Sequence, residues 1–274
     1  MIENKLPDGQ NEAWEEVLAS LCRLQDVLPD AVLVGGTASA LYAGHRFSFD
    51  HDHVLPDLRE RFDAILTELE SIAGWETARV KRPVLILGSL DGIETGVRQL
   101  RRARPLETTV MHVAGHDVSL PTLPEVLRIK AFLCLERNAT RDYLDLAALA
   151  AHMGIAAASE ALWPMDDLYP QKSGDPWAVR TQLVMQLALP QPYDLDSVNL
   201  AEYKGVHPPF DRWDYVAEVC GKISDELLNA CVEALHIDSS PKARQAQRKI
   251  DAWREARAEG QKPQPTNKLP GLES

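Results

Sequence analysis

A single stretch of this chain, residues 32–52, constrains its fold more than any other. It begins with a short apolar run, which is followed at once by Gly35 and Gly36. Polar and apolar residues then alternate as far as Asp50 and Asp52. Because residues two apart in a strand point to the same side, both carboxylates should project from one face. The stretch therefore predicts a buried strand, a glycine turn and a second strand that carries an acidic pair.

The acidic pair indicates a metal site beside a phosphate cradle. Two carboxylates so close together repel each other unless a cation lies between them, so we expect Asp50 and Asp52 to bind Mg²⁺. The backbone N–H groups of Gly35 and Gly36 can approach phosphates closely. Thr37 would open a helix whose N-terminus favours anions. Bound metal and a positioned phosphate chain are what the transfer of a nucleotide requires.

Other side chains of the same stretch allow more than one interpretation. Ser48 could donate to a phosphate oxygen. Arg46 could orient a carboxylate or the phosphate tail, or it could form an ordinary surface salt bridge. The alternating His45, His51 and His53 could bind a transition metal, although the flanking acids suit Mg²⁺ better.

The motif resembles the first motif of the polymerase-β-type nucleotidyltransferases, and it is most similar to the AbiEii/MenT-like toxin branch of bacterial toxin–antitoxin systems. The residues that carry this resemblance are Gly35-Gly36-Thr37 followed by Arg46-x-Ser48-x-Asp50-x-Asp52. A second match, similar to the later motifs of that branch, is Lys130, Arg137 and then Arg141-Asp142-x-x-Asp145-Leu146. Together the two matches span roughly residues 32–149.

The resemblance implies an α+β fold, in which a polymerase-β-like mixed sheet flanked by helices is followed by a mainly helical C-terminal region. It also implies an enzyme that transfers a nucleotide from an NTP to an acceptor, with tRNA expected and a protein possible. A cognate antitoxin is an implied partner. Two alternatives stay open: a small-molecule, aminoglycoside-type nucleotidyltransferase, and a nucleotide-binding module without turnover.

The resemblance assigns roles to individual residues. It implies catalytic roles for Asp50, Asp52, Lys130 and Asp142, and nucleotide-binding roles for Gly35, Gly36, Thr37, Arg46, Ser48 and Lys130. Lys130 would act at the triphosphate, and Asp142 would complete the charge network or position Lys130. By residue type alone, Lys130 could extend to solvent and Asp142 could cap a helix. Many nucleotidyltransferases have a third carboxylate, for which the candidates are Asp91, Glu94 and Asp117.

Apolar periodicity predicts three regions: mixed strands and helices over residues 1–120, a mainly helical region over 121–259, and a disordered tail over 260–274. The resemblance implies that the first is a nucleotidyltransferase-like domain and that the second closes the nucleotide cleft. Strands are expected at 32–34, 47–54, 83–87, 92–100, 108–113 and 116–120. Helices are expected at 11–28, 37–42, 58–72, 123–137, 155–168, 176–187, 213–235 and 242–258, with a further helix capped by Thr140. Residues 190–209 are proline-rich and should form a loop.

Composition favours a cytoplasmic protein. No apolar run approaches the ~20 residues of a membrane span, and the N-terminus does not resemble a signal peptide. The four cysteines have no zinc-ligand spacing and should be free thiols in a reducing compartment. The net charge of −12 opposes broad nucleic-acid binding. Two local basic stretches, 98–104 and 242–257, could nevertheless guide a phosphate backbone.

Overall fold

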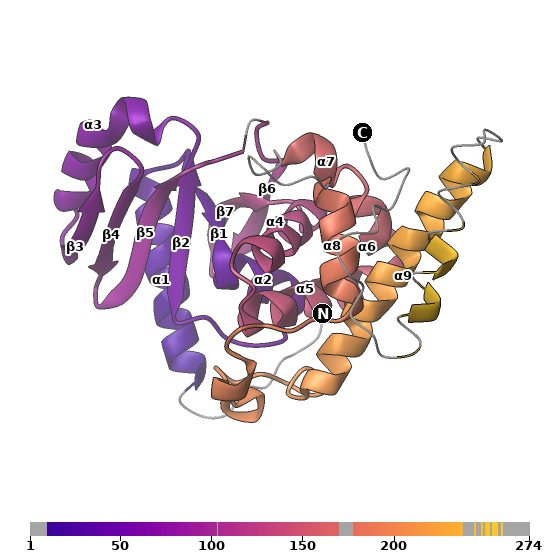
Figure 1. The fold of residues 1–274 in the computed structure, drawn as a ribbon. Coiled ribbons are helices and arrows are strands. Elements are labelled where there is room, and N and C mark those ends of the chain that lie inside the picture. The colour runs from indigo at the N-terminus through magenta and orange to yellow at the C-terminus, as the bar shows by residue number, and fades with distance from the viewer. Residues whose placement is uncertain are drawn as a thin grey trace. The chain divides into compact units, whose positions relative to one another are not determined.

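The computed structural model describes residues 10–102, 104–169 and 178–237, together with part of the range 244–259 (Figure 1). Contacts divide the chain into two compact units. The first unit comprises residues 1–126 and 201–208, and the second comprises residues 127–200 and 209–274. Most of the predicted helix at 242–258, and all of the predicted tail at 260–274, lie outside the described residues.

The first unit is built on a five-stranded mixed sheet with the strand order β1-β2-β5-β4-β3. Its strands are β1 (Val32–Val34), β2 (Asp50–Leu55), β3 (Trp75–Lys81), β4 (Leu85–Leu90) and β5 (Ile93–Gln99). Strands β2 and β5 run parallel, whereas the other neighbours pair antiparallel. Strand β3 was not predicted, because this edge strand is almost wholly exposed and has no apolar alternation.

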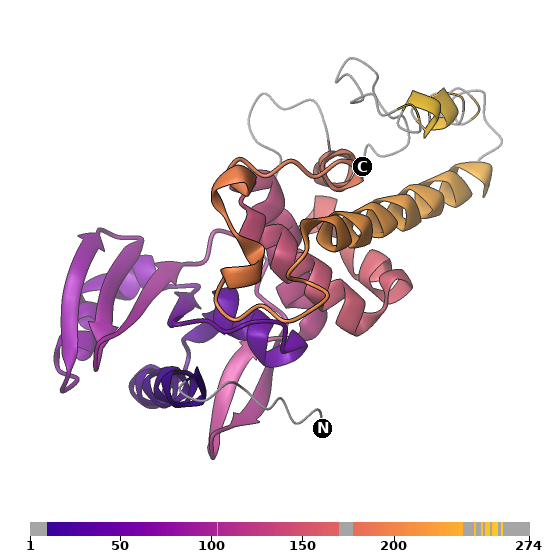
Figure 2. The same ribbon diagram turned by 90° about the horizontal axis from the view of Figure 1, so that it is seen from below.

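Helices α1 (Gln10–Val27) and α3 (Leu58–Glu70) pack on one face of this sheet (Figure 2). Their apolar sides form a buried core with side chains of β2, β4 and β5. This core contains Leu24 and Leu58 of the helices and Leu55, Ile86 and Val97 of the strands. Full burial of each such side chain contributes roughly 1.5–3 kcal/mol to the free energy of folding. A hairpin of β6 (Thr108–Val113) and β7 (His116–Pro121) contacts β1 and α1 through β7.

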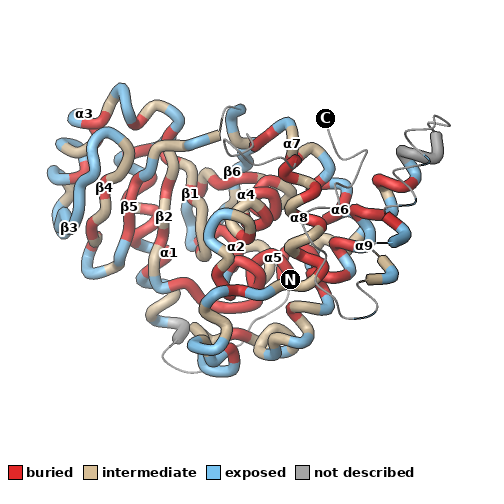
Figure 3. The backbone as a smooth tube through the Cα atoms, in the orientation of Figure 1, coloured by how far each residue is buried: buried red, intermediate tan, exposed pale blue. Residues whose placement is uncertain are grey.

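The second unit is helical. It contains most of α4 (Leu123–Glu136), followed by α5 (Thr140–Met153), α6 (Ile155–Leu162), α7 (Met165–Leu168), α8 (Val179–Ala188) and α9 (Trp213–Ile237). Helix α9 packs against α5, α6 and α8. Helix α5 is buried over most of its length, as Figure 3 shows. The expected α+β class, with a mixed sheet flanked by helices and a helical C-terminal region, is confirmed.

The start of α5 corrects one prediction. Thr140 is the first helical residue rather than the N-cap, which is Ala139. The backbone N–H and the Oγ1 hydroxyl of Thr140 both donate to Asp194 Oδ1 at 2.7 Å. A carboxylate distant in sequence therefore satisfies this helix end. Asp194 belongs to the predicted loop, which contains two short 3-10 helices, η1 (Leu195–Ser197) and η2 (Leu200–Glu202).

The structure also bears on the expectations for membrane-spanning segments and for the cysteines. Among the described residues, no helix combines the length and the apolar character needed to cross a bilayer. All four cysteines, Cys22, Cys134, Cys220 and Cys231, are free and buried. Burial raises the pKa of the Cys220 thiol to about 12, so this thiol stays protonated at neutral pH.

The inner face of β2 holds two buried histidines. The ring of His51 makes two hydrogen bonds: Nε2 lies 3.0 Å from Ser20 Oγ, and Nδ1 lies 2.9 Å from Thr95 Oγ1. Burial lowers the pKa of His51 to about 4, although the charge of Asp50 acts in the opposite direction. Burial also lowers the pKa of His53, and His51 adds to that effect. Both imidazoles are therefore neutral in the folded chain.

We predict that stability falls as the pH drops from 6.5 to about 4. The unfolded chain binds a proton at position 51 more readily than the folded chain, because the pKa of His51 is lowered from 6.5 to about 4 on folding. This one residue should contribute about 1.4 kcal/mol per pH unit across that window. Denaturant unfolding of His51→Gln across the window should show a shallower loss, with the exposed His116→Gln as control. An unchanged pH profile in His51→Gln would contradict the prediction.

Candidate active site

The turn from β1 into α2 (Gly35–Ala43) requires both of its glycines. Gly35 has a φ of 81°, in the left-handed region that side chains disfavour. A Cβ on Gly36 would lie 2.6 Å from Arg46 Nη2 and 2.6 Å from Ser48 Oγ. The first turn of α2 is therefore packed directly against the segment that leads into β2.

Asp50 and Asp52 lie on the outer face of β2. Burial alternates along the strand, so that these two residues are partly exposed while His51 and His53 are buried. Asp52 pairs in register with Val34, the residue before the glycine turn. A Cβ on Gly35 would lie 3.7 Å from Asp52 Oδ2. The register thus places the acidic pair beside the start of α2.

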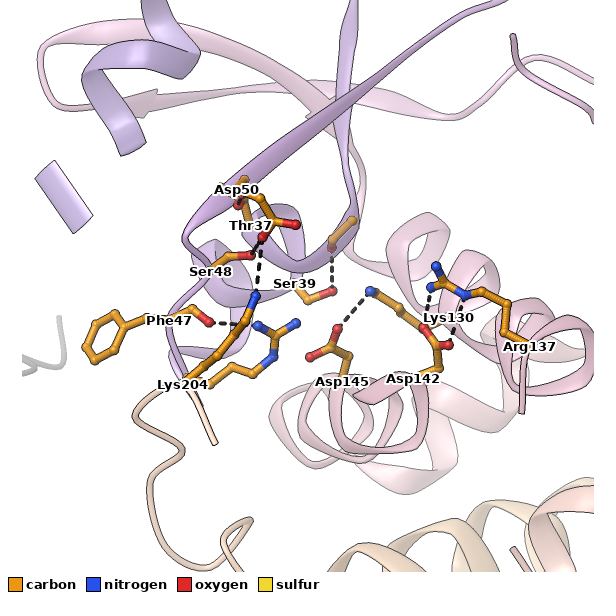
Figure 4. Close-up of polar contacts among 12 residues, drawn as sticks. Thr37, Ser39, Phe47, Ser48, Asp50, Lys130, Arg137, Asp142, Asp145 and Lys204 are labelled. Carbon is orange, nitrogen blue, oxygen red and sulfur yellow. Dashed lines mark hydrogen bonds and ion pairs between the residues drawn. The ribbon is translucent and has the colours of Figure 1, made fainter. Parts of the chain in front are cut away.

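Three contacts hold Asp50 (Figure 4). Ser48 Oγ donates to Asp50 Oδ1 at 2.7 Å, and Lys204 Nζ lies 3.6 Å from the same oxygen. Thr37 Oγ1 donates to the Asp50 carbonyl at 2.5 Å. Burial raises the pKa of Asp50, but the Ser48 hydrogen bond and the charges of Lys204 and Arg46 outweigh it and lower the pKa overall. The carboxylate is therefore ionised at neutral pH.

Two buried hydroxyls and a buried guanidinium lie around the pair. Thr37 and Ser48 are buried, with 0% and 1% of their surface exposed, and their hydroxyls point to Asp50. Arg46 is 5% exposed, and its Nη1 donates to the Phe47 carbonyl at 2.7 Å. Arg46 is therefore a buried side chain and not an exposed one.

The donor set suits Mg²⁺ better than a transition metal. Asp52 accepts from Arg98 Nε and Nη2 at 3.3 Å and remains about one third exposed. Mg²⁺ is commonly held by one or two carboxylates together with substrate phosphates, which this pair can provide. In the described ranges, no group of three or more His, Cys, Asp or Glu side chains could hold a metal ion. Both ring nitrogens of His51 lie at hydroxyls, those of Ser20 and Thr95, and His53 is fully buried, so the histidines are less available to a metal ion than the acidic pair.

The register separates the three candidates for a third carboxylate. Glu94 pairs with Asp50 across the parallel β2–β5 ladder and so lies on the same face of the sheet. Asp91 lies in the β4–β5 turn and pairs with Arg23. Asp117 lies in the β6–β7 hairpin, 3.0 Å from His112 Nδ1. Of the three, Glu94 is the one aligned with the acidic pair.

The second sequence match forms two ion pairs in the second unit. Lys130 Nζ in α4 lies 2.7 Å from Asp145 Oδ2 in α5, with side chains 3% and 0% exposed. Asp142 accepts from Arg137 Nη2 at 2.6 Å and from Arg137 Nε at 3.1 Å. Lys130 does not extend to solvent, and its partner is Asp145, which the motif contained but the site prediction omitted. The i, i+3 spacing of the two aspartates was the available signal.

The basic stretch at 98–104 is only partly available to a ligand. Arg98 binds Asp52, and the Arg102 side chain, 3% exposed, pairs with the fully buried Glu125. Arg101 and Arg104 are exposed. Fewer arginines than the sequence suggested can therefore contact a phosphate backbone.

Comparisons with known proteins give partial matches. No family model matches the chain. The heme uptake protein MmpL11 of Mycobacterium tuberculosis is 43% identical over 131 residues, which is 47% of this chain and 13% of that protein. The mycolic acid-containing lipids exporter MmpL11 of Mycolicibacterium smegmatis is 31% identical over 136 residues, 49% of this chain and 14% of that protein. The chain thus spans about one seventh of the length of these relatives.

Two solved structures show a distant likeness. JHP933 from Helicobacter pylori has a TM-score of 0.45 at 15% identity, covering 85% of this chain and all of that one. ANT(2'')-Ia in complex with adenylyl-2''-tobramycin has a TM-score of 0.43 at 12% identity, covering 57% of this chain and 98% of that one. Likeness at this level is too low to assign an activity.

We predict that Gly36→Ala disturbs the site. The added Cβ must displace Arg46 and Ser48, so we expect a loss of about 1–3 kcal/mol in unfolding free energy and weaker binding of Mg²⁺-NTP. Gly92→Ala is the comparison: its added Cβ meets no atom within 4 Å, and its cost comes from backbone strain at a φ of 83°. It should cost roughly 1 kcal/mol and leave binding intact. Denaturant unfolding and calorimetry provide the two measurements, and equal nucleotide binding by both variants would contradict the prediction.

We also predict that Asp145→Asn strongly destabilises the chain. The change leaves the buried Lys130 ammonium without its counter-charge, which typically costs about 3–5 kcal/mol. The exposed Asp167→Asn is the matched control. Because a buried ion pair can be replaced by apolar side chains, Lys130→Met combined with Asp145→Leu should recover much of the loss. Denaturant unfolding tests all three, and a small effect of Asp145→Asn would disprove the coupling.

Proposed function

We propose that this chain is a Mg²⁺-dependent nucleotidyltransferase that transfers a nucleotide from an NTP to an acceptor. One observation carries the proposal: the paired carboxylates of Asp50 and Asp52 share one face of β2 beside the two-glycine start of α2. A carboxylate pair next to the backbone N–H groups of a helix start suits a metal-bound triphosphate.

Asp50 and Asp52 would hold the metal, which would neutralise phosphate charge and activate the attacking oxygen. Ser48 and Thr37 would keep Asp50 in place through its side chain and its carbonyl. The N–H groups at the start of α2 would bind phosphate oxygens. Glu94, which the register aligns with Asp50, is the proposed third carboxylate.

The motif resemblance extends the proposal to the second unit. Lys130 would contact the triphosphate, and its pairing with Asp145 would hold the ammonium in one orientation. Asp142, bound by both donors of the Arg137 guanidinium, would complete the charge network. These roles rest on the sequence match, together with the burial of both carboxylates.

We propose tRNA as the acceptor and a toxin role restrained by a cognate antitoxin, with the cytoplasm as the location. The motif resemblance and the exposed Arg101 and Arg104 support an RNA acceptor. The second candidate is a small-molecule nucleotidyltransferase. The net charge of −12 favours it, because an acidic surface attracts a cationic acceptor and repels nucleic acid.

We expect label transfer from an NTP to a tRNA-sized product. Each radiolabelled NTP is incubated with the chain, Mg²⁺ and total cellular RNA, after which RNA, protein and free nucleotide are separated. Asp50→Ala and Asp52→Ala should lose the transfer, because neither leaves a complete metal site, and Glu94→Gln should reduce it. Label on protein, or on an added aminoglycoside, would redirect the acceptor. Intact NTP binding without transfer to any acceptor would support the non-catalytic alternative.

A further inference from the structure

We propose that Lys204 is a nucleotide-binding residue, whose ammonium moves from Asp50 to the phosphate oxygens when an NTP binds. This inference rests on the proposed function and adds a residue that no sequence motif indicated. Lys204 lies in a loop segment more than 150 positions after Asp50 in the chain. Its position depends on how that segment is attached.

The segment, residues 201–208, is here called the strap. It belongs to the first unit, although the residues on both sides of it belong to the second. Two backbone hydrogen bonds attach the strap to the segment before β2: Phe47 N–H donates to the Lys204 carbonyl at 3.0 Å, and His207 N–H donates to the His45 carbonyl at 2.8 Å. The strap is therefore fastened along the residues that lead to Asp50.

Ring contacts reinforce this attachment. The His207 and Phe47 rings meet edge to face, with centroids 5.9 Å apart. The Arg46 guanidinium lies 5.9 Å from the centroid of the Tyr203 ring. Because Arg46 also borders Gly36, the strap contacts the same packed group that shapes the glycine turn. Its position is thus tied to the geometry of the site.

The backbone of Lys204 is fixed in an unusual conformation. Its φ is 46°, in the left-handed region that non-glycine residues rarely adopt, and Gly205 follows with a φ of 63°. Such conformations persist where the surroundings impose them, and they often occur at binding sites. Here the Phe47 N–H group donates to the carbonyl of Lys204, the residue that has this conformation. The turn brings the side chain over Phe49, with Nζ 5.9 Å from the ring centroid. Figure 4 shows the ammonium reaching Asp50.

The contact between Lys204 and Asp50 is loose. Nζ lies 3.6 Å from Asp50 Oδ1, whereas Ser48 Oγ donates to that oxygen at 2.7 Å. The side chain of Lys204 is about one third exposed. A lysine ammonium is a compact charge on a flexible stem, so it can change partners without backbone movement. Asp50 therefore holds this cation at a longer distance than it holds the Ser48 hydroxyl.

A bound Mg²⁺-NTP would change the balance of charge around Lys204. A divalent cation on Asp50 would repel the ammonium, while the phosphates that arrive with the metal would offer new anionic oxygens. Lysine binds phosphate as a point charge and needs no fixed geometry. Arg46 is buried and Arg98 binds Asp52, so Lys204 is the partly exposed cation that the structure places at Asp50.

The test uses two variants of Lys204 and one control. Lys204→Met keeps the length of the side chain without its charge, and Lys204→Arg keeps the charge. The control Lys81→Met removes one exposed lysine from β3, the sheet edge remote from β2. Calorimetric titration with each Mg²⁺-NTP gives Kd, and steady-state turnover gives KM and kcat separately. Thermal unfolding checks that each variant is folded.

We expect Lys204→Met to raise Kd and KM by roughly 10-fold or more, as the loss of a charge-assisted contact to phosphate does. Lys204→Arg should stay within a few-fold of the parent, and Lys81→Met should match it. Equal binding by Lys204→Met and the parent would overturn the inference. Tighter binding by Lys204→Met would overturn it too, because Lys204 would then compete with the metal. Absence of NTP binding by the parent itself would instead overturn the proposed function, and this inference with it.

Discussion

The pairing of β2 between β1 and β5 is the constraint on which the rest of the site depends. Each residue of a strand faces the side opposite to its neighbours, so the register turns Asp50 and Asp52 outward and His51 and His53 inward. A slip by one residue would exchange the two sets, burying the carboxylates and exposing the histidines and Leu55. The apolar core under β2 therefore also determines which side chains of this strand are partly exposed.

Charge compensation differs between the two units. Each aspartate of the two motifs pairs with a cation. Asp50 and Asp52 pair with Lys204 and Arg98, which lie outside the first motif. Asp142 and Asp145 pair with Arg137 and Lys130, which belong to the second motif itself. The two pairs on the sheet are partly exposed and long, at 3.3 and 3.6 Å, so an incoming ligand can replace the protein cation at little cost. The Lys130–Asp145 pair is buried and short, at 2.7 Å. Removing either partner would leave the other charge buried, with neither a counter-charge nor water to stabilise it.

Periodicity predicted much of the fold. The helices at α1, α3, α4 and α9 have apolar residues on one side, and their predicted ranges agree with the structure to within a few residues. Strand β3 was not predicted, because it is an exposed edge strand and its sequence shows no apolar alternation. The N-cap assigned to Thr140 was wrong because Asp194, 54 positions away, satisfies that helix end. Local patterns fail where a distant residue provides the missing interaction.

The sequence by itself determined which side chains share a face, because alternation and helical spacing are local properties of the backbone. It therefore identified Asp50 with Asp52, and it contained the i, i+3 pair Asp142 and Asp145. Only the tertiary structure decided which residues lie beside them: the parallel register aligns Glu94 with Asp50, the strap brings Lys204 to Asp50, and Lys130 in α4 pairs with Asp145 in α5. Those choices depend on contacts between residues far apart in the chain, and no short-range pattern records which distant side chain will complete a charge.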